Sequence, residues 1–261
     1  MVIDREFLGF GGATLSGKKQ QKLKAECSRR IQEEMKPALS QRFAELLVTG
    51  SGWSLEAASP DEDADQQTLL FQYPTVFPTP ASYLRPVVKI EMGARSQTEP
   101  AADAPIQCYV AEVIPGALTE HTFPIRTVVA RRTFWEKVML LHEETFRPSP
   151  PAGSPVRKPA LARHYYDVYR LIEAGIADEA LADAGLLEQV LAHRKVFFGY
   201  GWMDYTTIQR GTLRLLPLDH QRAAWHQDYA AMRREMFFGP APDFETMLAR
   251  IDAFARRFNG S

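Results

Sequence analysis

The stretch PVVKIEMGAR, Pro86–Arg95, decides how the fold is interpreted. Its apolar side chains alternate with charged ones, and successive side chains of a strand point to opposite faces of a sheet. The apolar positions are Val88, Ile90 and Met92, and the charged ones are Lys89, Glu91 and Arg95. The pattern predicts a strand with one core face. Its charged face is either a solvated row of ion pairs on an antiparallel sheet or one wall of a functional site.

Composition bounds the class of protein. A chain of 261 residues that is 45% hydrophobic and 24% charged is typical of a globular protein with a real core. A net charge of −1 gives no overall basic field for nucleic acid. Cys27 and Cys108 form no CxxC, so neither a disulfide framework nor a structural zinc site is expected. Without a transmembrane-length apolar run or a signal-peptide pattern, a cytoplasmic location without membrane contact is expected.

The segments before residue 131 favour a mixture of helix and strand. In Lys18–Val48, apolar side chains recur every four residues from Leu23 to Met35, which predicts a helix. Pro37 predicts a kink, or a new helix with this proline in its first turn. Ser59–Gln66 is expected to be an acidic turn, and the segment from Gly93 to Pro105 a polar connection. Expected strands are Trp53–Ala57, Thr68–Tyr73, Pro86–Arg95, Ile106–Val113 and Arg126–Val129.

From residue 131 the expected structure is almost wholly helical. Expected helices are Arg132–Phe146, Leu161–Gly175, Asp178–Ala184, Leu186–Phe198, Asp219–Arg234 and Asp243–Phe258. Ser149–Pro159 is proline-rich and is expected to be a mobile loop. The fold class is therefore α+β, with a sheet covered on one face. The expected domains are an α+β unit over residues 1–130 and a helical unit over residues 131–261.

Several motifs favour ordinary structure over chemistry. GGATLSG, Gly11–Gly17, lacks the lysine and serine spacing of a P-loop, so a flexible loop is favoured over a phosphate cradle. The DEDAD run, Asp61–Asp65, is favoured as a solvated turn over a divalent-ion site. The six histidines show no HExxH spacing, and no GxSxG is present.

Lys137 and Asp167 are candidates from their positions. Lys137 lies at the edge of the apolar stripe of its expected helix, so it either extends to water or is held over a groove as a cation for phosphate. Asp167 either pairs with Arg163 or Arg170, each about one helical turn away, or has a functional role. Each residue taken alone is more often structural.

Four ordered motifs resemble one family. VVKIEMGARS, RTFWEKVMLLH, RHYYDVYRL and the late GTLRLLP…DYAAM resemble the AbiEii/AbiGii-type nucleotidyltransferase toxins over nearly the whole chain. The resemblance implies an incomplete polymerase-β-like nucleotidyltransferase sheet with helices, followed by an α-helical C-terminal domain. It also implies transfer of a nucleoside monophosphate from NTP, with Mg²⁺, to an RNA (tRNA) or protein acceptor. A cognate antitoxin of a toxin–antitoxin (abortive infection) system in bacterial defence is the implied protein partner.

The resemblance also implies roles for individual residues. Lys137 matches the lysine expected to contact the NTP phosphates. Asp167 matches the aspartate expected to position that lysine or the acceptor hydroxyl. Glu91 stands where such folds place a third carboxylate near the metals, and the neighbouring cations expected to bind nucleotide are Lys89, Arg95 and Arg163.

The sequence departs from the family pattern at its beginning. The family's glycine-serine motif and its D-x-D strand, which carries two metal carboxylates, have no match, so an N-terminal truncation is expected. Glu91 alone cannot hold two Mg²⁺ ions. Two hypotheses follow: a nucleotidyltransferase in function or descent, expected to have feeble activity or none, or a non-catalytic remnant acting as a binding or interaction protein. An open sheet edge is also expected to favour a homo-oligomer.

Overall fold

The structure is a computed structural model that describes most of the chain. The described residues are 3–10, 15–48, 50–75, 85–95, 97, 99–114, 116, 118–120, 122–148, 161–237 and 239–260. The expected loop at Ser149–Pro159 and the first four residues of GGATLSG lie outside them.

Two helices at the start pass into one another through a π-helical turn. Helix α1 spans Gly17–Arg30, the π-helical turn Ile31–Met35, and α2 Lys36–Leu46. Pro37 lies in the first turn of α2, as expected, directly after the π-helical turn, where its missing N–H leaves that turn one backbone donor short. The predicted stripe is confirmed, because Leu23, Cys27 and Ile31 are at most 1% exposed.

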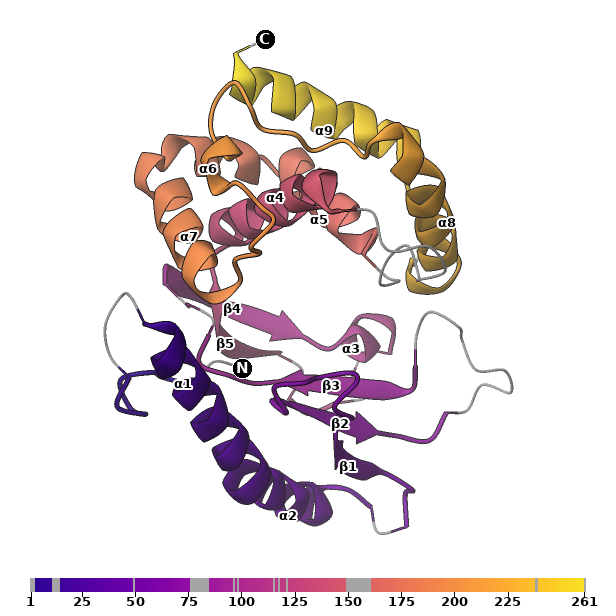
Figure 1. Cartoon of the computed structure of the whole chain (residues 1–261). Helices are drawn as coiled ribbons and strands as arrows, with labels where there is room; N and C mark the ends of the chain where they lie inside the picture. The colour runs from indigo at the N-terminus through magenta and orange to yellow at the C-terminus, as the bar shows by residue number, and fades with distance from the viewer. Residues whose placement is uncertain are drawn as a thin grey trace.

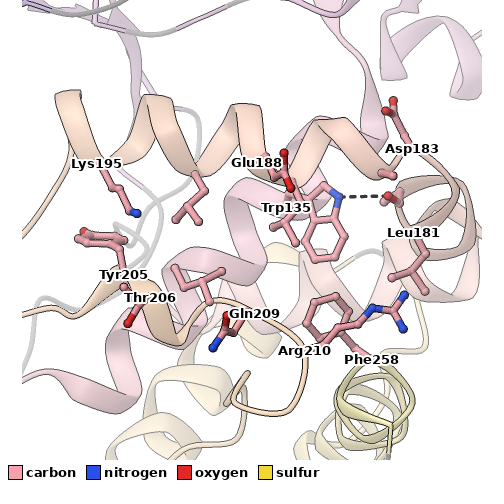
Figure 2. A pocket seen from close by; sticks show the side chains of 15 residues that line it. Trp135, Leu181, Asp183, Glu188, Lys195, Tyr205, Thr206, Gln209, Arg210 and Phe258 are labelled. Atoms are coloured by element: carbon pink, nitrogen blue, oxygen red, sulfur yellow. Dashed lines mark hydrogen bonds between the residues drawn. The ribbon is translucent and has the colours of Figure 1, made fainter.

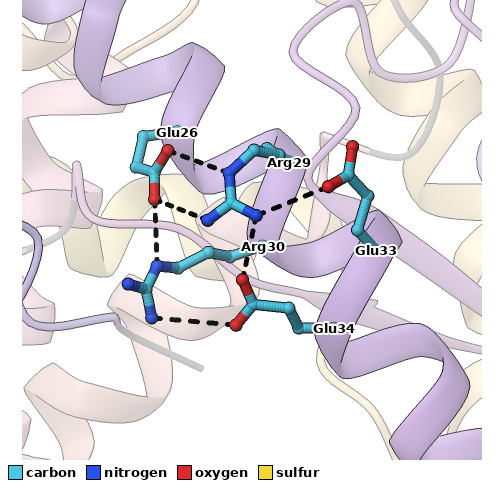
Figure 3. Close-up of polar contacts among 5 residues, drawn as sticks. All are labelled: Glu26, Arg29, Arg30, Glu33 and Glu34. Carbon is cyan, nitrogen blue, oxygen red and sulfur yellow. Dashed lines mark hydrogen bonds and ion pairs between the residues drawn. The ribbon is translucent and has the colours of Figure 1, made fainter.

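The two arginines at the end of α1 are paired with nearby acids. Figure 3 shows Glu26 accepting hydrogen bonds from Arg29 and Arg30, with Glu33 and Glu34 beyond them. These arginines, Arg29 first, lower the pKa of Glu26 to about 2. Arg29 and Arg30 thus form a solvated ion-pair network with these acids.

The stretch Pro86–Arg95 supplies the edge strand of a three-stranded antiparallel sheet. Its strands are β1 Ser54–Ala57, β2 Thr68–Gln72 and β3 Val87–Glu91, in that order. Ile90 lies opposite Leu69, and their face packs against α1 (Figure 1). Lys89 and Glu91 therefore point to the other face. The predicted core face is confirmed at Ile90 and Met92 but is wrong at Val88, which is 51% exposed.

A separate two-stranded ribbon corrects two expectations. Strand β4 covers Ala101–Gln107, where a polar connection was expected, and α3 covers Tyr109–Val113, where a strand was expected. The small and polar residues of β4 carry no strand pattern, and pairing with β5, Thr122–Val128, supplies its structure. Short apolar runs such as α3 fit a helix or a strand equally well.

From Ala130 onward, the regular elements of the described chain are all helical, and a long irregular segment separates α7 from α8. Figure 1 shows α4 and α5 between the sheets and α9. The centre line of α4, at Phe134, Val138 and Leu141, is fully buried, as predicted. Gly175 ends α5 in the left-handed conformation. The helices are α4 Ala130–Phe146, α5 Arg163–Glu173, α6 Ile176–Ala182, α7 Ala184–Phe197, α8 Asp219–Met236 and α9 Phe244–Asn259, with a short 3-10 turn at Tyr205–Thr207.

Burial of His142 predicts a loss of stability in mild acid. Its Nδ1 accepts the backbone N–H of Arg214 at 2.9 Å, and its Nε2 is 2.9 Å from the hydroxyl of Thr207. Burial lowers the pKa of His142 from 6.5 to about 4. The unfolded chain therefore binds this proton first, so stability is complete above pH 6.5 and falls as the pH drops toward 4.

We expect urea unfolding between pH 7 and pH 5 to show this loss, at roughly 1 kcal/mol per pH unit for each such histidine. This range lies above the titration of the carboxylates. His142→Gln keeps hydrogen-bonding groups and removes the titrating imidazole. The unfolding free energy of this variant should therefore fall less steeply with pH, by the contribution of one histidine. An unchanged slope in that variant would show that His142 does not titrate in this range.

Candidate functional site

A lysine, an aspartate and a histidine meet where α4 packs against α5. The Nζ atom of Lys137 lies 3.1 Å from Oδ2 of Asp167 and 3.0 Å from Nδ1 of His164. Asp167 and His164 are three residues apart on α5, so one helix face presents both to the lysine. Asp167 thus pairs across helices, and not with Arg163 or Arg170 on its own helix.

The protonation states make Lys137 a positioned cation. Burial lowers the pKa of His164, outweighing the opposite effect of the neighbouring Asp167, so the imidazole is neutral near pH 7 and its Nδ1 accepts from the lysine. Burial raises the pKa of Asp167, but the neighbouring His164 and the charge of Lys137 bring it below its usual value. Two of the three ammonium N–H groups are therefore occupied by described residues. The third is available to a ligand, because the side chain is 26% exposed.

His164 is the site residue to which the sequence analysis gave no role. The available signal was its spacing, because a histidine three residues before an aspartate shares its helix face. Arg163, the predicted phosphate contact, is exposed at the first position of α5. Its role in binding stays a prediction.

The charged face of β3 lines a second feature, a pocket of about 450 Å³. Lys89, Glu91 and Arg95 all border it, so the structure brings together three residues predicted from one stretch. Arg95 forms an ion pair with Asp65 at 3.2 Å, and its guanidinium lies 5.3 Å from the ring centre of Phe198, which also lines the pocket. We call this the β3 pocket.

Lys137, Asp167 and His164, here called the lysine cluster, do not line the β3 pocket. Among the described residues that line the β3 pocket, none comes from α4 or α5. Lys137 and Asp167 are in contact with each other. The expected meeting of both residues with Glu91 around one ligand stays a prediction. Figure 1 shows α4 and α5 on the side of the helical half that faces the sheets.

The described acids do not form a site for Mg²⁺. Glu62 pairs with Arg85 at 2.8 Å, and Asp63 accepts the backbone N–H of Gln67 at 2.7 Å. Burial raises the pKa of Asp63, but hydrogen bonds, that of Thr68 foremost, lower it overall. Within the described ranges, no three His, Cys, Asp or Glu side chains gather as metal ligands. Because Mg²⁺ needs an octahedral oxygen shell, these residues do not fit it.

A second cavity lies among α4, α6 and α7 and measures about 460 Å³ (Figure 2). Its inner wall is apolar and includes the ring of Trp135, whose Nε1 donates to the carbonyl of Ala180 at 3.2 Å. Lys195 and Glu188 lie at its exposed edge. None of the predicted site residues borders it.

Comparison with known proteins identifies a family for almost the whole chain. A family model described as nucleotidyl transferase AbiEii toxin, Type IV TA system, matches residues 18–250. No curated protein and no solved structure matches the chain. Across the described residues, none of the helices has the length and apolar character needed to cross a membrane.

Proposed function

The chain belongs to the AbiEii nucleotidyl transferase toxin family, and from that premise we propose that Lys137 binds the phosphates of a nucleoside triphosphate. We further propose that the chain transfers the nucleoside monophosphate to an RNA end such as that of tRNA. Membership in a family of type IV toxins brings with it an NTP substrate and an antitoxin counterpart.

The proposed reaction is a displacement at the α-phosphorus of the NTP. A hydroxyl oxygen of the acceptor forms the new bond to phosphorus, the bond to the bridging oxygen of the β-phosphate breaks, and pyrophosphate leaves. The hydroxyl proton is released to water. Negative charge on the phosphate oxygens is what a fixed cation stabilises in such transfers.

The contact of Lys137 with Asp167 and His164 carries the proposal. Two acceptors hold the ammonium in place, so little side-chain entropy is lost when a phosphate binds. Asp167 is ionised and paired, which makes it a poor proton acceptor and suits it to positioning the lysine. We propose that Arg163, at the start of the same helix, adds a second cation for the phosphates.

The β3 pocket is proposed to hold another part of the same nucleotide. Its volume of about 450 Å³ lies in the range of small-molecule sites. Lys89 and Arg95 would contact the nucleotide there, and Glu91 would face it. Under this proposal, residues 1–130 and 131–261 act as two domains that contribute to one site.

Transfer of label from NTPs tests the proposal. The chain would be incubated with each α-³²P-labelled NTP and a panel of RNAs that includes total tRNA, with and without Mg²⁺. We expect label on RNA, pyrophosphate release, and loss of both in Lys137→Ala. Saturable NTP binding without transfer to any acceptor would favour the non-catalytic alternative, and absence of binding would exclude the proposed site.

A further inference from the structure

Two exposed aromatic rings are stacked on one another just after α7. The rings of Tyr200 and Trp202 have centres 4.7 Å apart and an interplanar angle of 15°. Tyr200 is 41% exposed and Trp202 is 36% exposed. Of the four tryptophans, Trp135 and Trp225 are 1% exposed and Trp53 is half-buried, so Trp202 is the one most open to solvent.

An arginine completes this surface. The guanidinium carbon of Arg147 lies 5.7 Å from the ring centre of Tyr200 and 5.6 Å from that of Trp202. Both carboxylate oxygens of Glu144 bind the guanidinium and orient it. The side chain of Arg147 is nevertheless 35% exposed, so part of its charge remains accessible. We call Tyr200, Trp202 and Arg147 the aromatic platform.

Hydrogen bonds to buried side chains fix the backbone that carries the aromatic platform. The N–H of Tyr200 donates to the hydroxyl of Tyr205 at 3.0 Å, and that hydroxyl donates to Glu143 at 2.9 Å. Glu143 is in turn bound by Arg194. At Gly199 a Cβ atom would lie 2.5 Å from the carbonyl oxygen of Lys195, so only glycine allows this path of the chain. A buried polar network thus holds the solvent-exposed stacked rings in place.

We propose that the aromatic platform binds an unpaired base of single-stranded RNA, with Arg147 beside a backbone phosphate. Any base can stack on Tyr or Trp, and Arg adds cation–π and phosphate contacts, so the platform suits an RNA end without sequence preference. Phe198 begins the same loop and lines the β3 pocket, which places the platform next to the proposed nucleotide site. The inference rests on the proposed function, since it concerns the acceptor.

Binding of a short fluorescein-labelled single-stranded RNA, followed by anisotropy without NTP, tests the platform. We expect Tyr200→Ala and Trp202→Ala each to weaken binding about tenfold, and Trp202→Phe to retain most of it. Tyr109→Ala, which removes another exposed tyrosine, is the matched control and should bind like the parent. RNA should also quench the fluorescence of Trp202, and circular dichroism would confirm that the variants fold.

Several outcomes would overturn the inference. Unchanged RNA affinity in both alanine variants, or equal affinity for a blunt duplex, would exclude base stacking here. Quenching of Trp202 by an NTP alone at similar affinity would assign the platform to the nucleotide. Concentration-dependent self-association that Trp202→Ala removes would assign it to protein contacts.

The experiments can contradict the RNA-binding role of the platform and the proposed function independently of each other. Lys137→Ala should leave RNA affinity unchanged while it removes NTP binding. RNA binding that depends on the platform, without any label transfer, would count against the proposed function alone. Label transfer with an unchanged KM for RNA in Tyr200→Ala would count against the platform alone.

Discussion

Lys137→Ala is expected to weaken NTP binding by about a hundredfold or more, because it removes a positioned cation from the proposed phosphate site. Lys137→Arg should restore little of this. The planar guanidinium cannot occupy the point where one ammonium contacts both His164 and Asp167. Isothermal titration with a non-hydrolysable NTP analogue measures the affinity.

Lys22→Ala is the matched control for this prediction, since Lys22 is exposed on α1 and lies outside both proposed binding features. Asp167→Asn should weaken binding less than Lys137→Ala, because it loosens the lysine but leaves its charge. If Lys137→Ala lowers thermal stability yet binds NTP like the parent, the three residues form only a structural ion pair.

Glu143→Ala is expected to cost about 3–5 kcal/mol of unfolding free energy, because it leaves a buried guanidinium without its counter-charge. The side chain of Glu143 is 1% exposed and that of Arg194 is 14% exposed. The hydroxyl of Tyr205 loses its acceptor in the same variant. Urea unfolding followed by far-UV circular dichroism measures the loss.

A double replacement distinguishes the net contribution of the ion pair from the cost of leaving one charge buried alone. Glu143→Met with Arg194→Met removes both charges, so we expect it to be clearly more stable than Glu143→Ala. Glu188→Gln, at an exposed position of α7, is the control and should change stability little. A loss below about 1 kcal/mol in Glu143→Ala would mean that water enters and solvates Arg194.

Local sequence patterns predicted most helices and strands. They failed where pairing with another strand or contact with distant residues determines the structure. The stripe from Leu23 to Ile31 follows helical spacing and is confirmed. Strand β4 was missed because its residues have no alternation and its structure depends on β5. The same limit applied to the site: Lys137 and Asp167 were identified, but His164 was given no role.

By itself, the sequence determined the apolar faces, the α+β class, the helical second half and the family, because periodicity and ordered motifs are local properties of the chain. Only the tertiary structure decided which distant side chains meet. Lys137 contacts Asp167, Glu143 binds Arg194, and Phe198 reaches the β3 pocket. These contacts depend on how helices pack on helices and on the sheet, and such packing is set by the whole core.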